Sequence, residues 1–417
     1  MNLEALSSLV TRATAPGRFY RRLYGMKEGD APLSINSWEE WKTLPLLTKS
    51  DLLNEPLSER SFLPIRDVDY LTSTSGTTGT LPLFSPRTQL LEYEFRTEFY
   101  DAAGPVFSSK LVPHQQEQFL SARNLWPRVV VIDPRNPESS VRLARAAGVD
   151  AIFAFLSHIP LVAGHMVRES IAENIRFIEV AGETCSRAQF EYMHRTFPNA
   201  VIISTYGLSE VENSPVGIPC RPMTAGNPLP VYHAKDGVYL ELLDTKTGTV
   251  LEPEAGVEGE LVITAYRGEP AAFPTLRYKS GDTVRVVDEH CTAHGSWSFT
   301  VLGRSDIDFV KIPGGMLKVD EIGRTLRALN DVVTDNFVLH LRNAADGART
   351  RAILHVEPHA AVDLAVLAGR IAIELRVSPT SSYADGVAQG LYEPLICQLL
   401  DKARGDIYKQ KSIILEP

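Results

Sequence analysis

Residues Thr72–Thr80 read Thr-Ser-Thr-Ser-Gly-Thr-Thr-Gly-Thr, and this run directly follows the strand-like stretch Val68-Asp-Tyr-Leu71. Gly76 and Gly79 allow positive φ angles and let the backbone approach a ligand closely. The hydroxyls and N–H groups around them can together cradle phosphate oxygens. The run therefore predicts a phosphate-binding loop. It is not a Walker A loop, because no Gly-Lys-Ser/Thr follows at the required spacing. A flexible Ser/Gly linker is the alternative interpretation.

Three further segments combine glycine with polar or charged residues. In chain order they are Ser204-Thr-Tyr-Gly-Leu-Ser-Glu210, Tyr278-Lys-Ser-Gly-Asp282, and a stretch that opens with Gly303-Arg-Ser-Asp306 and continues through Lys311, Gly314 and Gly315 to Glu321. The first two follow predicted strands at 201–203 and 260–264. Each glycine-bearing motif is thus expected at the carboxyl end of a strand, where open α/β sheets bind their ligands.

Together and in this order, the four segments resemble the adenylate-forming superfamily. That superfamily includes the acyl-CoA and aryl-CoA ligases, the luciferases and the adenylation domains of peptide synthetases. The resemblance runs from about Leu71 to the end of the chain. Within that superfamily the chain is most similar to the phenylacetate-CoA ligase branch, because it is short and has no lysine soon after the glycine-rich loop.

Length and charge narrow the possibilities. The 417 residues exceed a single typical core and predict two or three domains. The net charge is 42 − 51 = −9, which argues against nucleic acid or an anionic membrane surface as the main partner. No apolar run approaches the length of a membrane span, and the four cysteines form no disulfide framework. A cytoplasmic location is the expectation.

The order of predicted elements indicates an α/β protein. Strand-like segments at 129–132, 151–155, 177–181 and 201–204 alternate with helix-like segments at 138–147, 160–173 and 186–197. This βαβ rhythm predicts a mainly parallel, helix-covered sheet in a large N-terminal domain. Shorter strands from 238 on predict a β-rich subdomain over about 230–304. Residues 1–304 are expected to form the AMP-binding core, and 305–417 a small α+β cap.

The resemblance assigns nucleotide-binding roles within the core. The phosphate loop would hold the β- and γ-phosphates of ATP, Tyr206 would pack on the adenine, and Asp282 would accept hydrogen bonds from the ribose hydroxyls. Ser209 would lie beside the α-phosphate, and Glu210 would bind Mg²⁺, which prefers carboxylate and phosphate oxygens. The full set of cofactor-binding residues is Thr74, Ser75, Gly76, Thr77, Thr78, Gly79, Gly182, Glu183, Tyr206, Gly207, Asp282 and Arg304. Taken singly, each also has a structural interpretation, such as a core aromatic, a turn residue or a surface ion pair.

The cap should supply a catalytic lysine and a hinge. Lys409 falls where the resemblance places the lysine that neutralises charge during adenylation, although Tyr408 stands where a glycine is usual. Asp306 matches the hinge about which the mobile cap of that family rotates, but Ile307 replaces the usual second acid. The pair Gly314-Gly315 would approach the pantetheine of CoA or of a carrier protein.

A structural zinc site is a further candidate. Members of the phenylacetate-CoA ligase branch often carry Cys and His in the corresponding segments, and here the matching residues are Cys220, His233, Cys291 and His294. Thiolate and imidazole are suitable zinc ligands. The complete Cys-x-Cys-Gly pattern is missing, so isolated buried cysteines and surface histidines are the competing interpretation.

The resulting functional hypothesis is ATP-dependent activation of a small carboxylic acid, aromatic or hydrophobic, as its acyl-AMP. Transfer to CoA or to a carrier-protein thiol would follow, and the acid pocket is expected between about Phe153 and Gly207. The altered hinge and lysine segments keep two alternatives open. One is an amide- or ester-forming synthetase with the same first step, and the other is a nucleotide-binding homologue without turnover. An acyl-carrier protein and a second copy of the chain are the candidate protein partners.

Overall fold

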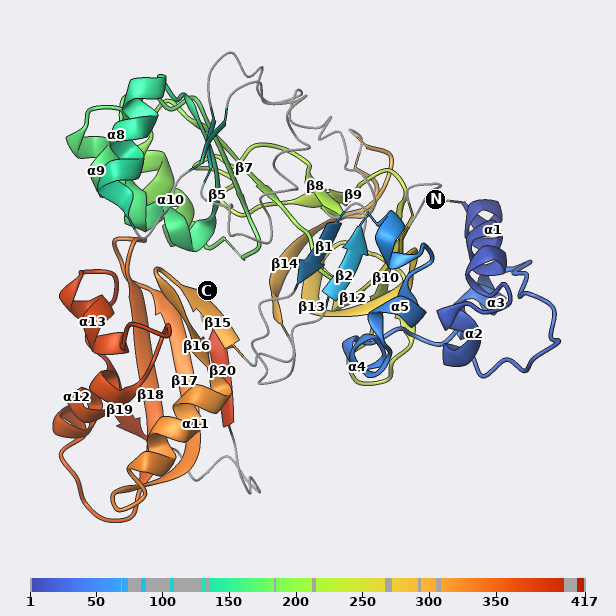
Figure 1. Cartoon of the computed structure of the whole chain (residues 1–417). Helices are drawn as coiled ribbons and strands as arrows, with labels where there is room; N and C mark the ends of the chain where they lie inside the picture. Colours follow the sequence, from blue (N-terminus) through green and yellow to red (C-terminus); the bar gives the residue numbers. More distant parts are fainter. Residues whose placement is uncertain are drawn as a thin grey trace.

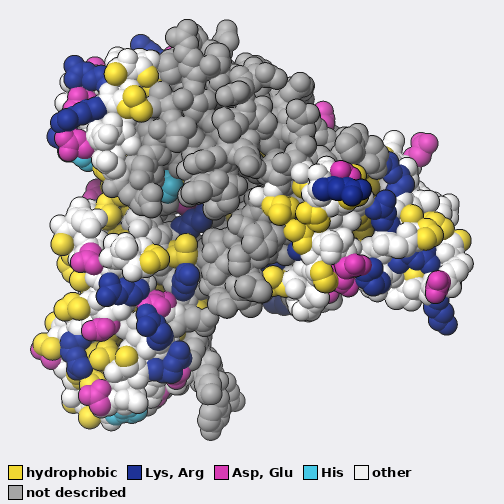
Figure 2. Space-filling view, viewed as in Figure 1, with side chains coloured by type: hydrophobic (Ala, Val, Ile, Leu, Met, Phe, Trp, Pro, Cys, Tyr) yellow, Lys and Arg dark blue, Asp and Glu magenta, His cyan; other side chains and the backbone are white. Residues whose placement is uncertain are grey.

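The computed structural model describes residues 2–68, 70–73, 84–87, 106–108, 129–131, 136–183, 185–211, 215–266, 272–291, 294–304, 309–400 and 411–415. It shows a larger unit, with the N-terminus at one end, and a smaller unit built from the C-terminal part of the chain (Figure 1). On the face drawn in Figure 2, acidic and basic side chains are interspersed over the smaller unit. Among the described residues, no helix is long and apolar enough to cross a membrane.

A five-stranded parallel sheet organises one half of the larger unit. Its order is β4 (Val129–Val131), β3 (Val106–Ser108), β5 (Ala151–Phe155), β6 (Phe177–Ala181) and β7 (Val201–Thr205). The helices α8 (Pro137–Ala147), α9 (Ile159–Arg168) and α10 (Arg187–Thr196) pack against one face of this sheet. Alternate strand residues such as Ile152, Ala154, Ile178 and Val180 form the shared core, as the two-residue period of a strand requires.

The predicted alternation of strands and helices from 129 to 204 is confirmed here, with two differences. Strand β3, between β4 and β5 in the sheet, was not predicted. Helix α9 was expected to run to residue 173 but ends at Arg168. Ser170 adopts a φ of 56°, a left-handed conformation that a right-handed helix cannot contain. A short 3₁₀ turn (Ala172–Asn174) then leads into β6.

The second half of the larger unit is a mostly antiparallel seven-stranded sheet. Its order is β11 (Val250–Leu251), β10 (Val238–Leu243), β12 (Glu258–Ala265), β13 (Thr275–Asp288), β14 (Ser298–Arg304), β9 (Tyr232–Ala234) and β8 (Gly217–Pro219). The prediction that every glycine motif follows a strand is wrong for Tyr278–Asp282, which lies inside β13. A register irregularity between Glu260 and Val262 of β12 faces this segment. Such a bulge bends a strand locally and lets it continue through a glycine.

Short helices from the first 60 residues pack on the seven-stranded sheet. They are α1 (Leu3–Ala13), α2 (Phe19–Leu23), α3 (Trp38–Thr43), α4 (Lys49–Asn54) and α5 (Leu57–Arg60). Capping fixes several of their starts, as at α4, where Thr48 and Asp51 form a capping box. Trp41 and Tyr20 are fully buried. Trp41 packs edge-on against Tyr239 of β10, and Tyr20 stacks on Phe273, which lies just before β13. A two-stranded antiparallel pair, β1 (Tyr70–Ser73) with β2 (Phe84–Arg87), lies beside α5 (Figure 1).

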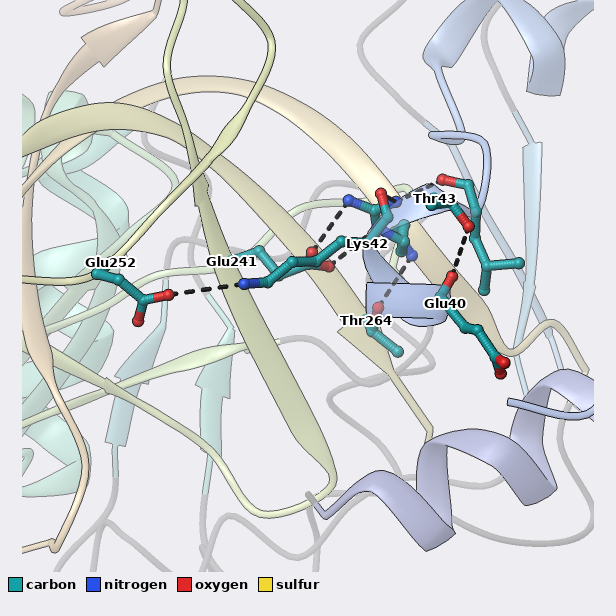
Figure 3. A network of polar contacts seen from close by, with 8 residues as sticks. Glu40, Lys42, Thr43, Glu241, Glu252 and Thr264 are labelled. Atoms are coloured by element: carbon teal, nitrogen blue, oxygen red, sulfur yellow. Dashed lines mark hydrogen bonds and ion pairs between the residues drawn. The ribbon is translucent and has the colours of Figure 1, made fainter. Parts of the chain in front are cut away.

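A buried arginine, Arg277, joins this N-terminal segment to the sheet, and two of its partners, Lys42 and Glu241, are labelled in Figure 3. Arg277 of β13 donates from Nε and Nη2 to the Glu241 carboxylate, at 3.1 and 3.0 Å. Its Nη1 donates to the carbonyls of Lys42, in the last turn of α3, and of Leu44, the C-cap of that helix. Leu47 then pairs with β13 on either side of Tyr278. The N-terminal helices are thereby tied to the strand that carries Asp282.

The smaller unit has its own hydrophobic core. A sheet with the order β19 (Ile396–Leu399), β18 (Thr350–Pro358), β17 (Val333–Asn343) and β20 (Lys411–Leu415) packs against α11 (Val319–Ala328) and α12 (Leu364–Glu374). The hairpin β15 (Phe309–Ile312) and β16 (Gly315–Lys318) precedes them, and α13 (Tyr383–Ala388) follows α12. Every member of this core comes after Arg304. This core is compatible with the predicted domain boundary at 304/305, which remains a prediction.

Candidate functional site

The carboxyl ends of three parallel strands define one edge of the larger unit. In register, Phe155 of β5 pairs with Ala181 of β6, and Ala181 pairs with Thr205 of β7. The residues that follow, Gly182 after β6 and Tyr206 after β7, therefore emerge side by side. Gly182 and Tyr206 are both candidate adenine-binding residues, so the register brings together two segments that are 24 residues apart.

Gly182 has a conformation and surroundings that exclude other residues. Its φ is +75°, and a Cβ atom there would lie 2.9 Å from Cε1 of Phe155. The carboxylate of the next residue, Glu183, accepts two hydrogen bonds from Ser157. One comes from the Ser157 N–H and one from the Ser157 hydroxyl, both at 2.7 Å. The backbone at 182–183 is therefore the part of this segment that can face a flat ligand, in keeping with the predicted role of lining the adenine.

Tyr206 links the two sheets of the larger unit. Its hydroxyl donates to Oδ2 of Asp282 at 2.5 Å. Asp282 lies on β13 directly opposite Arg304 of β14, and its side chain is only 8% exposed. Three residues predicted to bind the nucleotide are thus brought together. Tyr206 follows β7, Asp282 lies within β13, and Arg304 ends β14. The side chain of Arg304 itself lies outside the described residues.

The backbone around Tyr206 is held on both sides. Its N–H donates to the carbonyl of Gly217, and the N–H of Gly217 donates back to the Tyr206 carbonyl. A Cβ on Gly217 would lie 3.1 Å from the Tyr206 Cβ and 3.3 Å from Cζ of Phe299. The ring of Tyr206 itself packs against the rings of Tyr232 and Phe299, with centroids 6.0 and 5.8 Å away, so its position is fixed by close packing.

Glu210 and Ser209 lie just beyond this position. Glu210 is buried, with 7% of its surface exposed, and its Oε1 is 3.7 Å from Nζ of Lys49 in α4. A single buried carboxylate that leaves most of the coordination sphere to phosphates and water is a donor set that Mg²⁺ accepts. Lys49 was not predicted, and no sequence motif marks it. It would compete with the metal for this carboxylate.

Several predicted residues cannot be placed. Residues 74–79, Asp306 and Lys409 lie outside the described residues. Their assigned roles in phosphate binding, hinge motion and catalysis therefore stay predictions.

Lys311 is a further charged group at this edge that was not assigned a role. It belongs to β15 of the smaller unit, and its Nζ lies 4.4 Å from the ring centroid of Phe155. The same Nζ would be 3.8 Å from a Cβ on Gly182. A cation placed over an aromatic face is attracted to it. The position of Lys311 in the segment after Gly303-Arg-Ser-Asp306 was the available signal.

Three of the four candidate zinc ligands come together at the β9–β8 edge of the seven-stranded sheet, and the fourth, His294, lies beside one of them. The ligand atoms of Cys220, His233 and Cys291 lie within 4.8 Å of one another. The ring of His294 lies with its centroid 4.2 Å from that of His233. Cys220 follows β8, His233 is in β9, and Cys291 and His294 belong to the connection from β13 to β14. Sheet pairing of His233 with Ile218 and Ser298 brings these segments together.

The geometry and the hydrogen bonding of this cluster suit a metal. The two sulfur atoms are 3.7 Å apart. Two thiolates on a tetrahedral zinc, with Zn–S bonds of about 2.3 Å, lie about 3.8 Å apart. His233 is fully buried, and neither of its ring nitrogens has a hydrogen-bond partner among the described residues. Such an orphaned buried imidazole is costly unless a ligand satisfies it.

The shifted pKa values favour the metal-binding form of His233 but not that of the Cys220 thiol. Burial, with a smaller contribution from His294, lowers the pKa of His233 to about 4, so its imidazole is neutral and can bind a metal. Burial and the neighbouring Cys291 raise the pKa of Cys220 to about 11. A bound cation would reverse that shift, because a coordinating thiol is deprotonated.

Comparison with known proteins adds evidence on the fold. No protein-family model matches this sequence, and no curated protein sequence matches it. Among solved structures, the chain is similar to 2-hydroxyisobutyryl-CoA ligase in complex with 2-HIB-AMP and CoA in the thioesterification state. The TM-score is 0.65 at 16% sequence identity, over 99% of this chain and 88% of that chain.

Other states of the same ligase are also similar. The postadenylation state in complex with 2-HIB-AMP gives a TM-score of 0.60 at 16% identity, over 99% of this chain and 88% of that one. An open conformation in complex with 2-HIB-AMP and CoA also gives 0.60 at 16% identity, with coverage of 99% and 90%. The chain therefore shares the mixed α/β fold of 2-hydroxyisobutyryl-CoA ligase, with both parallel and antiparallel sheets.

Proposed function

We propose that this protein is an adenylate-forming ligase that activates a carboxylic acid with ATP and passes the acyl group to a thiol. The observation that carries the proposal is the link between Tyr206 and Asp282 beside Gly182. It supplies a flat backbone surface, an aromatic ring and a carboxylate at one edge of the fold. These are the groups that a base and a ribose require. The fold of acyl-CoA ligases supports the proposal independently.

The reaction has two balanced steps. In the first, a carboxylate oxygen attacks the α-phosphorus of ATP, the bond to the β-phosphate breaks, and acyl-AMP and pyrophosphate form. In the second, the thiol of CoA loses its proton and attacks the acyl carbon, and AMP leaves with the bonding electron pair. The first step joins two anions, so positioning and charge neutralisation have to provide the acceleration.

The residues divide between these tasks. Tyr206, the backbone at Gly182 and Asp282 would hold the nucleoside. The phosphate loop 74–79 and Glu210, through Mg²⁺, would hold the phosphates, and Lys409 would neutralise charge at the reacting phosphorus. Metal-ion binding here would polarise the phosphate oxygens. A small aromatic or hydrophobic acid, as in the phenylacetate-CoA ligase branch, is the proposed substrate.

The proposal predicts a defined set of products. With ATP, Mg²⁺, CoA and the right acid, the protein should release AMP and pyrophosphate in equal amounts and form an acyl-CoA thioester detectable by mass spectrometry. Reactions with an amine or an alcohol in place of CoA provide the control for the acceptor. Acid-dependent AMP release that gives an amide or ester, and no thioester, would refute the thiol assignment. Release of ADP instead of AMP would refute adenylation altogether.

We also propose that Cys220, His233, Cys291 and His294 hold a structural zinc ion. The ion would tie the β8–β9 segment to the β13–β14 connection. Tyr232, next to His233, packs on Tyr206 and Phe299 and hydrogen-bonds to Ser204. The metal would therefore stabilise the strands behind the candidate adenine-binding wall, without taking part in the reaction.

Purified protein should contain about one zinc per chain by plasma mass spectrometry, and His233→Ala should lose it. Because ligand binding stabilises the folded state, removal of the zinc by a chelator should lower the Tm by several degrees. His290→Ala is the matched control, since this exposed histidine directly precedes Cys291. Wild-type protein that carries no stoichiometric metal after growth with added zinc would contradict the site.

A further inference from the structure

We infer that the turn between β17 and β18 docks on α10 and fixes the smaller unit in the pose used for acyl transfer. Asn343 and Arg195 are positioning residues in this docking contact. That the pose serves acyl transfer rests on the proposed function. The contact itself rests on geometry alone.

The turn meets both ends of one helix. Asn343, the last residue of β17, donates from Nδ2 to Oγ of Ser186 at 2.6 Å, and Ser186 is the N-cap of α10. Arg195, in the last turn of α10, donates from Nη2 to the carbonyl of Asp346 at 2.9 Å. The nine steps along the chain from Ser186 to Arg195, at about 1.5 Å each, span about 13.5 Å. Two contacts at that separation resist rotation far better than one.

The turn holds its shape without the helix. The Asp346 carboxylate accepts hydrogen bonds from the N–H groups of Ala348 and Arg349, and from Nε of Arg349 at 2.6 Å. Ala344 and Arg349 close the turn with a backbone hydrogen bond of 2.8 Å. The carbonyl of Asp346 is therefore presented to Arg195 in a fixed direction, which lowers the entropic cost of docking.

The helix in turn connects to the candidate nucleotide site. Ser186 comes three residues after Glu183, on the segment that leaves Gly182. A second contact between the units occurs at the same edge, where Lys311 of β15 lies over Phe155. The two contacts hold the smaller unit at the strand ends where Tyr206 and Gly182 emerge. A cap fixed there can present β15 and β16 to the nucleotide.

The comparison with 2-hydroxyisobutyryl-CoA ligase indicates which pose this is. The whole chain superposes better on the thioesterification state, at a TM-score of 0.65, than on the postadenylation and open states, at 0.60 each. These structures share one sequence, so the difference between them reflects how their parts are arranged. The docking contact therefore belongs to an arrangement like the thioester-forming one.

Removal of the contact should affect one half-reaction. A pose held by one neutral and one charge-assisted hydrogen bond should lose about fivefold of its population in Asn343→Ala and about tenfold in Arg195→Ala. We expect the double variant to transfer the acyl group to CoA at least about tenfold more slowly in single turnover. Pyrophosphate exchange, which needs only acid and ATP, should stay within about twofold of wild type.

The pose can also be read without turnover. Fluorophores introduced as unnatural amino acids at Leu143 of α8 and Ile373 of α12, which are 53% and 62% exposed, report the arrangement by energy transfer. The double variant should show a broader or shifted distribution of transfer efficiency than wild type. Arg168→Ala, at an exposed arginine in the last turn of α9, is the control and should match wild type.

The outcomes separate the two proposals. An unchanged energy-transfer distribution in the double variant overturns the docking contact, whether or not the protein turns over. Equal losses in exchange and in acyl transfer overturn its link to the second step. A wild-type protein that exchanges pyrophosphate with no acid counts against the proposed function, and energy transfer still decides whether the turn docks.

Discussion

Replacement of Asp282 with alanine is expected to weaken ATP binding by about 100-fold. A carboxylate that accepts two hydrogen bonds from ribose hydroxyls contributes about 1.5–3 kcal/mol for each bond to a charged group, part of which water replaces in the variant. The substitution also removes the acceptor of the Tyr206 hydroxyl. Because the Asp282 side chain is almost wholly buried, its charge is poorly screened by solvent. Calorimetric titration with ATP and Mg²⁺ measures the effect.

Two companion variants give this result its meaning. Tyr206→Phe keeps the ring and removes only the hydroxyl, so we expect a loss of about fivefold, the size of one hydrogen bond. Asp331→Ala, at an exposed aspartate of the smaller unit, should bind ATP as wild type does. An Asp282→Ala protein with wild-type affinity and an unchanged Tm would show that the nucleotide does not lie against β13.

Replacement of Arg277 with alanine should produce the largest loss of stability. The Arg277 and Glu241 side chains are 3% and 2% exposed, and two hydrogen bonds join them. Removing one partner leaves a buried charge without its counter-ion, which costs about 3–5 kcal/mol. The carbonyls of Lys42 and Leu44 lose their donor as well (Figure 3). We expect the Tm of the larger unit to fall by on the order of 10 °C.

Matched changes on the same strand test this cause. Arg285 of β13 pairs with Glu258, but these side chains are 50% and 46% exposed, so Arg285→Ala should cost less than about 1 kcal/mol. The double change Arg277→Met with Glu241→Leu should recover much of the lost stability, because no unpaired charge remains. A double variant as unstable as Arg277→Ala would mean that the carbonyl contacts, and not the ion pair, hold the N-terminal segment.

The pH dependence of the Arg277→Ala defect has a definite sign. Burial raises the pKa of Glu241, and Arg277 opposes that rise. Without Arg277, the folded-state pKa lies further above the unfolded value, so the folded protein binds the proton more tightly. Stability is then retained at low pH and lost as the pH rises through the folded-state pKa. The difference in the free energy of unfolding between Arg277→Ala and wild type should therefore be larger at neutral pH than at the acidic pH where carboxyl groups ordinarily titrate.

Local pattern was enough to predict most of the larger unit. The strands β5, β6 and β7 are buried almost continuously, as apolar runs such as 151–155 and 177–181 in a helix-covered parallel sheet predict. Gly182, Tyr206 and Asp282 could be selected as candidate nucleotide-binding residues, because each lies in a segment that resembles a motif of the adenylate-forming superfamily. Of the candidate zinc ligands, Cys220, His233 and Cys291 have their ligand atoms within 4.8 Å of one another, and the ring of His294 lies beside that of His233. Zinc binding by these residues stays a prediction.

Non-local contacts account for what sequence patterns did not reveal. Lys49 reaches Glu210 from 161 residues away, and Arg277 joins β13 to a segment more than 230 residues earlier. Neither pairing leaves a periodic signal, because only the packing of α3 and α4 on the sheet creates it. Tyr278–Asp282 was expected beyond the carboxyl end of a strand, whereas here the segment passes through a bulge inside β13.

The exchange of labelled pyrophosphate into ATP tests the central claim most directly. The assay needs Mg²⁺, ATP and a panel of aryl and short acyl carboxylic acids, and it omits CoA so that only the first step is observed. The proposed function predicts acid-dependent exchange with at least one member of the panel, lost in Asp282→Ala at ATP concentrations that saturate wild type. Exchange that does not depend on any acid, or no exchange by a protein that binds ATP tightly in calorimetry, would contradict it.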